Sequence, residues 1–574
     1  MFTLRVSNRD YTEWTFLVEH QAQAEQQTQA DQQTQADQQA QAEQSSPLEK
    51  KLFHGDSIDA AGQVITSPYR AKEAICGVLL TSEKTYGRAP NGKLLYKCVP
   101  DAEHLPYFLV PYDEKNSGFK KNKTDLYITF KITEWTQKHP LGLLTQTFGA
   151  VEDTEAYLAY HMACKEINDS IKTLNAASLR SLRENTLGPI PIYCQGLPIE
   201  DRRMLKIISI DPAGCNDMDD ALGIRNQNGE TILSIYISNV PMVLEHLNLW
   251  PYLTDRVATI YLPQRKIPML PIALSDNVCS LREKTDRIAF VLDVYLNSHA
   301  VVKEIKCTSA VIRVEKNYTY DAKELLGCEE YKWLFKTVKE LNTVHFQYLD
   351  KIGNSHDVVE YCMLLMNHEC AKRLEQKKAG IFRSAIKKTE EEGKKEETTD
   401  HEFALPELKR IFQQVAGEYC EYLDRKPHQM LGLKNYAHVT SPIRRLVDIV
   451  NIFELLEDTF PWTAEAKAFA TKWKDQLLIV NQKTKAIRKL QNEMELLEAY
   501  EKKQDRIYTG IVFQKSACVR SPMLYKYQAY IPETKMLTAV YSAKEYKNYA
   551  TVNFSVHLFL DEAKMTKKVR LQVL

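Results

Sequence analysis

The chain has 574 residues, of which 44% are apolar and 26% are charged, and its 75 basic side chains are balanced by 75 acidic ones. A chain of this length and composition predicts three or four globular domains. The zero net charge excludes a uniformly basic nucleic-acid-binding protein, so any basic surface must be local. No apolar run is long enough to cross a membrane, which excludes a membrane-spanning protein.

The spacing of the cysteines and the first residues of the chain both favour an intracellular location. The 12 cysteines include no Cys-x-x-Cys pair, which argues against a zinc site and against a disulfide framework. The opening Met-Phe-Thr-Leu-Arg-Val leads into polar and acidic residues and differs from a secretory signal. We therefore expect a soluble intracellular protein, with the cytoplasm and the nucleus both open.

The N-terminal part predicts a tail followed by a small β-barrel. Residues 1–47 are expected to be a low-complexity Gln/Ala-rich tail, in which residues 1–18 could add a short strand or helix and residues 21–44 repeat with a six-residue period. The repeat has no apolar stripe, so we interpret it as a tether, with a partner-binding segment as the alternative. Short apolar runs punctuated by Gly, Pro and Asn predict a barrel over residues 48–150. Residues 151–200 predict a helical linker.

An acidic segment follows a buried, β-branched run at residues 205–210. It places four carboxylates within ten residues, at Asp211, Asp217, Asp219 and Asp220. Carboxylates this close repel one another and stay ionised only beside a cation, and oxygen-only ligands favour Mg²⁺ or Mn²⁺. A solvated turn is the alternative interpretation. An EF-hand is excluded, because the loop lacks the required Gly and Glu.

A second segment, Tyr436–Asp448, predicts the start of a helix. Ser441 suits the N-cap and Pro442 suits the first helical position. An apolar stripe would anchor this helix in a core, and it comprises Ile443, Leu446, Val447 and Val450. Arg444 would then lie in the first turn, where free backbone N–H groups favour a phosphate. A surface arginine at a helix start is the alternative.

The remaining central and C-terminal residues predict helices and then strands. Residues 201–504 are expected to form one domain that ends in a long helical stretch from residue 463 to 503, possibly broken in two. Within it, residues 387–402 predict a charged, solvated loop. Residues 505–574 predict five strands with eleven Lys and Arg against five Asp and Glu, a net charge of +6. A basic five-stranded barrel of this kind would attract a polyanion.

Together the two segments resemble signatures of the RNase II/RNase R (RNB) family. A third match lies between them, at Tyr261–Pro271, and continues to Asp286-Arg287. The acidic segment is most similar to the eukaryotic branch that includes the catalytic subunit of the exosome, although residues upstream are too few for that subunit's endonuclease domain. The chain departs from the family pattern at Asn239, where an Asp is usual, and at Asn451-Ile452, where a His-Arg pair is usual.

The resemblance implies an α+β multidomain fold. It implies a cold-shock-like OB-fold over residues 48–150, an RNB-type α/β catalytic domain over residues 201–504 and an S1-like OB β-barrel over residues 505–574. It also implies a monomer that binds single-stranded RNA, with part of the RNA affinity at the C-terminal barrel. No membrane partner is expected.

The resemblance further implies a Mg²⁺-dependent, processive 3′→5′ exoribonuclease that releases 5′-mononucleotides by two-metal catalysis. Asp211, Asp217 and Asp220 would hold the metal. Asp219 would be both a ligand and a catalytic residue, and Arg444 would neutralise charge on the scissile phosphate. A catalytically idle RNA-binding scaffold of the same fold is the main alternative, and a different metal phosphohydrolase is a third.

Side chains that would contact RNA also follow from the resemblance. Tyr261 and Tyr320 match aromatic residues that clamp the terminal nucleotides, with core packing as the alternative for each. His438, Thr440 and Arg445 are expected to contact the RNA backbone. Two residues of the predicted helix at 358–374 match a family pattern, and these are Glu360 and Asn367.

Overall fold

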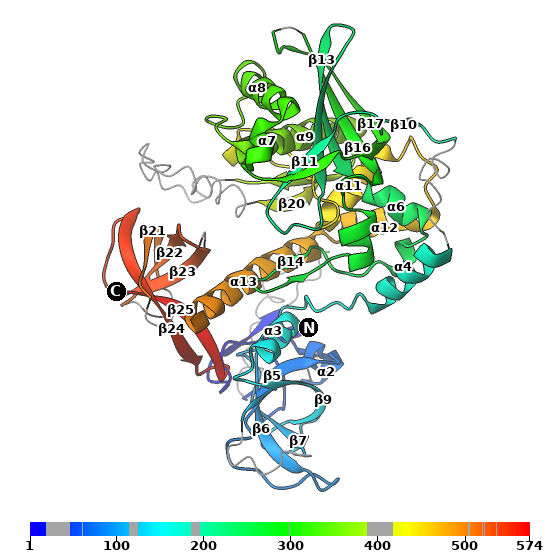
Figure 1. Cartoon of the computed structure of the whole chain (residues 1–574). Coiled ribbons are helices and arrows are strands. Elements are labelled where there is room, and N and C mark those ends of the chain that lie inside the picture. Colours follow the sequence, from blue (N-terminus) through cyan, green and yellow to red (C-terminus); the bar gives the residue numbers. More distant parts are fainter. Residues whose placement is uncertain are drawn as a thin grey trace, which may run out of the picture. The chain divides into compact units, whose positions relative to one another are not determined.

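The computed structural model resolves the chain into two compact units, one formed by Met1–Asn168 with Asn492–Leu574 and the other by Asp169–Gln491 (Figure 1). The structure describes residues 1–18, 46–59, 61–113, 124–184, 196–297, 299–386, 417–502, 506–518, 521, 523–534 and 536–574. The predicted tether at 21–44 lies outside these residues, as does the predicted loop at 387–402. No helix within the described residues is long and apolar enough to cross a membrane.

The first residues of the chain form strands, which is one of the two alternatives predicted for residues 1–18. Strands β1 (Phe2–Val6) and β2 (Trp14–Val18) join β3 (Ser57–Ile58) and β4 (Val64–Thr66) in a sheet of order β2-β1-β3-β4. Alternate side chains of β1 are buried, as expected for a strand with one face on a core. The composition of residues 1–47 is dominated by the long polar repeat, so the short apolar alternation at its start contributes little to it.

The predicted N-terminal barrel is confirmed. Five strands close it in the order β5-β6-β7-β9-β8. They are β5 (Ile75–Leu79), β6 (Leu94–Pro100), β7 (Phe108–Tyr112), β8 (Leu126–Glu134) and β9 (Leu141–Ala150). Aromatic residues of the barrel and apolar residues of β1 share one hydrophobic core, so the N-terminal sheet and the barrel fold as one body. Between β4 and β5 lies the short helix α2 (Pro68–Ala71).

Five C-terminal strands form an antiparallel sheet of order β23-β22-β21-β24-β25, as predicted. They are β21 (Tyr508–Ala517), β22 (Tyr525–Ile531), β23 (Met536–Ser542), β24 (Ala550–Asp561) and β25 (Thr566–Val573). Their inward residues, among them Val512, Tyr527 and Phe554, form a separate core.

A mixed seven-stranded sheet organises the central unit, in the order β10-β17-β16-β13-β12-β11-β18. Its strands are β10 (Ile199–Asp201), β11 (Ile208–Asp211), β12 (Asp220–Gln227), β13 (Glu230–Ser238), β16 (Asp286–Leu296), β17 (Val302–Arg313) and β18 (Lys316–Thr319). The two outer pairs, β10 with β17 and β11 with β18, are parallel, and the others are antiparallel. The acidic segment therefore connects two neighbouring strands, β11 and β12.

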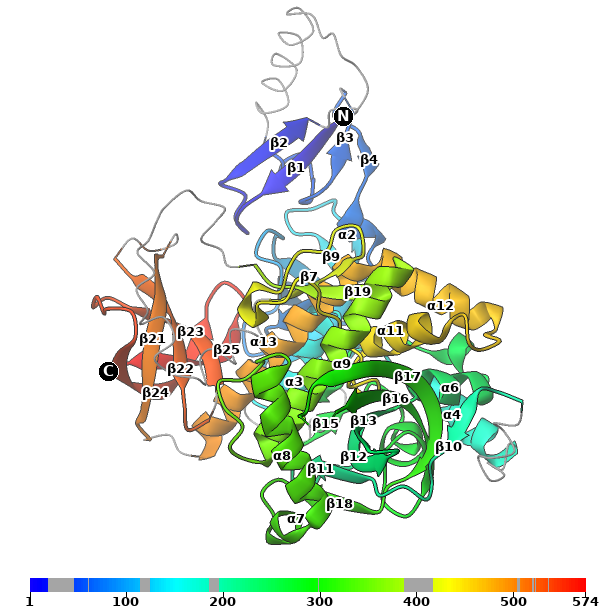
Figure 2. The ribbon, with the colours of Figure 1, turned by 90° about the horizontal axis from the view of Figure 1, so that it is seen from above.

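Helices and short hairpins surround this sheet (Figure 2). The helices are α6 (Val240–His246), α7 (Lys323–Gly327), α8 (Glu329–Val344), α9 (Ser355–Lys377), α11 (Leu446–Leu456) and α12 (Ala464–Asp475). The hairpins are β14 (Ile260–Tyr261) with β15 (Lys266–Ile267), and β19 (Ile381–Ser384) with β20 (Glu418–Glu421). Helix α9 is buried on most of its surface and packs against α8 and α11.

The linker and the C-terminal boundary of the central domain differ from the prediction. Residues 151–200 contain α3 (Thr154–Cys164) and α4 (Lys172–Glu184), which belong to different units, and β10 already pairs with the central sheet. The long helical stretch is broken in two, α12 and α13 (Leu477–Lys502), and the boundary between units falls inside α13.

The helix predicted to begin at Ser441 begins at Leu446 instead. Residues 257–259 pair with the residues just before the helix: the Thr259 N–H donates to the Arg444 carbonyl at 3.0 Å, and the Leu446 N–H donates to the Val257 carbonyl at 3.0 Å. This pairing holds Arg445 in an extended conformation, with φ −139° and ψ 125°. The apolar stripe itself is buried as predicted.

Candidate active site

The acidic segment is shaped by the two strands that it connects. Asp211 ends β11 and Asp220 begins β12. Gly214 takes a left-handed φ of +79°, which a glycine adopts without strain, and the Cys215 N–H donates to the Pro212 carbonyl to close a turn. The Asp219 carbonyl accepts a hydrogen bond from the Ser238 N–H of β13, so the end of the loop is fixed to the sheet.

Asp219 joins the acidic segment to the Tyr436–Asp448 segment. One of its oxygens accepts the backbone N–H of Ile443 at 2.9 Å, and the other accepts Nε of Arg444 at 3.0 Å. The Asp219 side chain is 3% exposed. Burial raises the pKa of Asp219 to about 7, against the opposing effect of Arg444. Residues far apart in the chain therefore meet at one carboxylate.

Asp211 and Asp220 stand at the two strand ends, and burial and neighbouring carboxylates raise the pKa of each. Burial raises the pKa of Asp211 to about 6, and one of its oxygens is buried without a hydrogen-bond partner among the described residues. Burial, together with the charges of Asp211 and Asp219, raises the pKa of Asp220 well above its ordinary value. A cation beside this pair would offset the repulsion and satisfy the orphaned oxygen.

Asp217 has partners of its own. Its two oxygens accept the Tyr261 hydroxyl at 3.0 Å and the Lys266 ammonium at 3.0 Å. It is buried, with 8% of its surface exposed. The four acids of the segment therefore have different surroundings, and the sequence alone does not distinguish them.

The described residues contain no group of three His, Cys, Asp or Glu side chains placed to hold a metal ion as they stand. The assignment of all four aspartates as ligands stays a prediction. The pair Asp211 and Asp220 fits a divalent cation best, because it combines an unpartnered carboxylate oxygen with oxygen-only donor chemistry.

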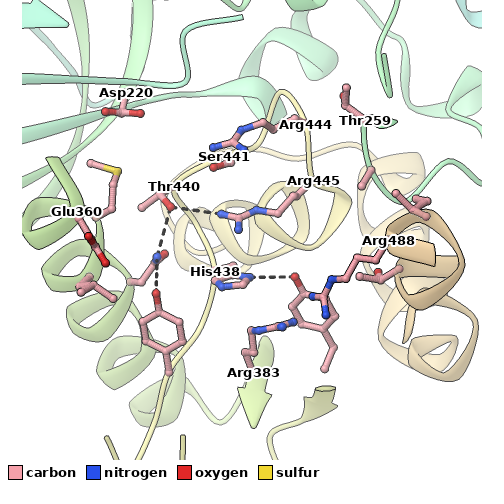
Figure 3. Close-up of a pocket in the computed structure, with 18 of the residues that line it drawn as sticks. Asp220, Thr259, Glu360, Arg383, His438, Thr440, Ser441, Arg444, Arg445 and Arg488 are labelled. Atoms are coloured by element: carbon pink, nitrogen blue, oxygen red, sulfur yellow. Dashed lines mark hydrogen bonds between the residues drawn. The ribbon is translucent and has the colours of Figure 1, made fainter. Parts of the chain in front are cut away.

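A cavity of about 550 Å³ opens beside the acids (Figure 3). Asp220 lines it, with Tyr261, Glu360 and residues of the Tyr436–Asp448 segment. Four arginines also line it, and they are Arg383, Arg444, Arg445 and Arg488. Figure 3 shows Arg383 of β19 and Arg488 of α13 at the end away from Asp220. The cavity therefore has an acidic end and a basic wall.

The basic wall is held by hydrogen bonds between polar side chains and the Tyr436–Asp448 segment. The Tyr419 hydroxyl lies 2.9 Å from Nδ1 of His438, and Nδ2 of Asn367 donates to the Thr440 hydroxyl at 3.3 Å. Arg445 reaches both Thr440, at 3.3 Å, and Asp448, at 2.9 Å. These contacts orient the side chains that face the cavity.

Tyr320 lies beside the acids and does not line the cavity. Its backbone N–H donates to the Asp211 carbonyl at 3.2 Å, and its ring stacks on His356 with the ring centroids 3.5 Å apart. Of the other predicted RNA contacts, Tyr261, His438, Thr440 and Arg445 all line the cavity.

Arg383, Arg488 and Tyr419 are cavity residues that the sequence did not reveal. Each stands in a segment without a recognisable motif, on β19, α13 and β20. Burial and the charge of Arg383 lower the pKa of Arg488 to about 10.

A model of the RNB domain matches residues 199–346 and 322–457. This chain therefore contains an RNB domain. RNB relatives include Exoribonuclease 2 of Proteus mirabilis, 29% identical over 323 residues that cover 44% of this chain and 50% of that protein. The exosome complex exonuclease RRP44 of Mus musculus is 37% identical over 123 residues, which cover 21% of this chain and 13% of that protein. The chain thus spans half or less of these two relatives.

Solved structures show the same fold. Mycoplasma genitalium RNase R in complex with double-stranded RNA superposes with a TM-score of 0.63 at 16% identity, covering 91% of this chain and 98% of that one. The structure of yeast Ssd1, a pseudonuclease, superposes with a TM-score of 0.53 at 16% identity, covering 83% of this chain and 66% of that one. The RNB fold therefore includes both nucleases and a protein described as a pseudonuclease.

Proposed function

We propose that this protein is a 3′→5′ exoribonuclease that hydrolyses single-stranded RNA processively to 5′-mononucleotides. The observation that carries the proposal is the contact between Asp219 and Arg444 at the acidic end of a basic cavity. A phosphodiesterase needs a positive group at the scissile phosphate and carboxylates close to it, and this contact supplies both from two distant motifs. We infer the polarity and the products from the similarity to the RNB relatives.

Asp219 and Arg444 have complementary roles in this proposal. Asp219 binds Nε of the guanidinium, and the side chain of Arg444 is 43% exposed. Among the described residues the other guanidinium N–H groups of Arg444 have no hydrogen-bond partner, so they can donate to a phosphate oxygen. The Ile443 N–H on the second oxygen of Asp219 sets the orientation of the carboxylate.

The acidic segment supports a divalent ion, and we propose Mg²⁺, with Mn²⁺ able to replace it. Asp211 and Asp220 would hold the ion directly, whereas Asp217 and Asp219, whose oxygens already accept hydrogen bonds, would contact it only through water. A bound ion of this kind activates water and stabilises charge on the phosphate. The carboxylates would hold the ion on the same side of the cavity as Arg444, which would bind the phosphate.

The cavity and the C-terminal sheet are the proposed RNA contacts. Tyr261 is 39% exposed at the cavity and offers a ring for a terminal base, while Tyr320 and His356 present stacked rings beside the acids. His438, Thr440 and Arg445 would contact the backbone of the RNA. The C-terminal strands, with their net charge of +6, would add sequence-independent affinity.

An idle RNA-binding scaffold is the second candidate, because a pseudonuclease shares the fold. The side chains argue for the enzyme: all four aspartates and Arg444 are present. A scaffold is free to lose any of them, since binding RNA does not require an acidic cluster that repels phosphate.

The experiment uses an oligoribonucleotide labelled at its 5′ end, with Mg²⁺ or with EDTA. We expect the wild type to produce a ladder of 3′-shortened products only with Mg²⁺. Asp219→Asn should lower the rate by about 10²–10³-fold, because it removes the charge that holds Arg444. Asp255→Asn, which changes an exposed aspartate, is the control. Internal cuts, equal cleavage of DNA or an unchanged rate for Asp219→Asn would overturn the proposal.

A further inference from the structure

The hairpin β14–β15 directs two side chains at one carboxylate. Tyr261 and Lys266 are direct cross-strand partners, so their side chains leave the hairpin on the same face. Tyr261 donates its hydroxyl to one oxygen of Asp217, and Lys266 places its ammonium 3.0 Å from the other. Asp217 is thereby the anchor of the hairpin.

Lys266 is held by a second carboxylate as well. Its ammonium lies 2.8 Å from Asp276, which belongs to the π-helical segment Ala273–Val278 and accepts the Ser275 hydroxyl at 2.6 Å. The three side chains are largely shielded from water, with exposed fractions of 24% for Lys266, 16% for Asp276 and 7% for Asp217. Burial lowers the pKa of Lys266, but its hydrogen bonds to Asp276 and Asp217 outweigh this and leave the pKa raised.

We propose that Lys266 is a resident counter-cation of the acidic segment, occupying between Asp217 and Asp276 the kind of position that a divalent ion takes between two carboxylates. Asp217 then positions Tyr261 and Lys266 instead of serving as an open ligand. Lys266 is a positioning residue: it neutralises one acid of the segment permanently, so that fewer carboxylates depend on an external ion.

The relevance of Lys266 to catalysis rests on the proposed function. The ion pairs of Lys266 with Asp217 and Asp276 do not depend on it. Removing the ammonium leaves two carboxylates facing each other across a partly buried space. Such a pair is destabilising without a cation and is a ligand set for a hard divalent ion. Loss of Lys266 should therefore convert an ion pair into a metal site.

The test compares the wild type with Lys266→Met, Lys266→Arg and Lys266→Met/Asp217→Asn, with Lys303→Met as a control for losing a lysine from an exposed ion pair. Melting temperatures are measured in EDTA and in millimolar Mn²⁺, and Mn²⁺ affinity is measured by calorimetry. Lys266→Met should melt roughly 3 °C or more below the wild type in EDTA. Mn²⁺ should restore the difference and bind at least about tenfold more tightly than to the wild type.

The other variants complete the test. Lys266→Arg should behave like the wild type, and Asp217→Asn in the Lys266→Met background should abolish the extra Mn²⁺ response. The inference is overturned if Mn²⁺ stabilises Lys266→Met no more than the wild type, or if Asp217→Asn alone weakens Mn²⁺ binding as much as Asp211→Asn does. A wild type that binds no Mn²⁺ would count against the proposed function, while the comparison with Lys266→Met still decides this inference.

Discussion

Arg444 keeps Asp219 usable as a charged group. Burial raises the pKa of Asp219 to about 7, and this value already includes the lowering by Arg444 and by the Ile443 N–H. Without the guanidinium, burial would raise the pKa of Asp219 further. Arg444 therefore stabilises the charged form of Asp219 in the protein by itself. In the proposed function, a bound phosphate would contact a guanidinium that Asp219 already orients.

Tyr261 combines a hydroxyl that is bound to Asp217 with a ring that is 39% exposed. Tyr261→Phe should cost about 1 kcal/mol of stability through the lost hydrogen bond and leave RNA affinity nearly unchanged. Tyr261→Ala should weaken binding of a single-stranded RNA 3′ end by about 5–150-fold, since stacking contributes roughly 1–3 kcal/mol per base. Fluorescence anisotropy in EDTA measures this without cleavage. Wild-type affinity in Tyr261→Ala, together with a lower melting temperature, would indicate packing instead of stacking.

Extended pairing, and not a helix terminus, positions Arg444. The strand-like contacts with residues 257–259 hold the chain open up to Leu446, and the carboxylate of Asp448 accepts the Ser441 N–H at 2.7 Å. Residues 441–446 are thus fixed on one side by Asp448 of the helix and on the other by residues 257–259. The residues that position the arginine belong partly to the segment that leads into Tyr261, so the two cavity walls are built together.

Thr259→Pro tests this element directly, because proline lacks the N–H that donates to the Arg444 carbonyl. A displacement of about 1 Å at Arg444 should lower the single-turnover cleavage rate by roughly 10²-fold. Thr259→Ser keeps the N–H and should retain most of the activity. Circular dichroism confirms that each variant is folded, and an unchanged rate in a folded Thr259→Pro protein would contradict the role of this pairing.

The central unit as a whole contains buried histidines that resist protonation. Burial, followed by the charge of Lys372, lowers the pKa of His368 to about 4, and burial followed by the charge of Arg383 does the same for His428. An unfolded histidine titrates near 6.5. The unfolded chain therefore binds more protons than the folded one between these values, so stability rises with pH over this window and is lost as the pH falls from about 6.5 to 4.

His428→Gln should reduce the dependence of the free energy of unfolding on pH, because it removes one of the two histidines. Each histidine contributes at most about 3 kcal/mol. The change in free energy of unfolding between pH 7 and pH 4 should be smaller in the variant than in the wild type, as measured by urea titration at each pH. His299→Gln changes an exposed histidine and serves as the control. Parallel curves for the wild type and His428→Gln would refute the assignment.

The sequence by itself determined the acidic segment, the Tyr436–Asp448 segment, the N-terminal barrel and the five C-terminal strands. These features depend on short-range patterns, such as alternating apolar residues and carboxylates spaced along one loop. For residues 1–18 the sequence left a strand and a helix both open, because part of the sheet that holds them, β3 and β4, lies beyond a long polar repeat. A five-residue strand carries too little pattern to be recognised without its neighbour.

Only the tertiary structure decided which acid has which partner. Asp219 meets an arginine 225 residues away, Asp217 is paired with Lys266, and Arg383 and Arg488 converge on one cavity from segments without motifs. The helix start at Leu446 was likewise set by pairing with residues 257–259 against the local preference for Ser441 and Pro442. Capping and propensity contribute about 1 kcal/mol each, whereas the burial of several apolar side chains contributes more. Packing therefore selects the partners.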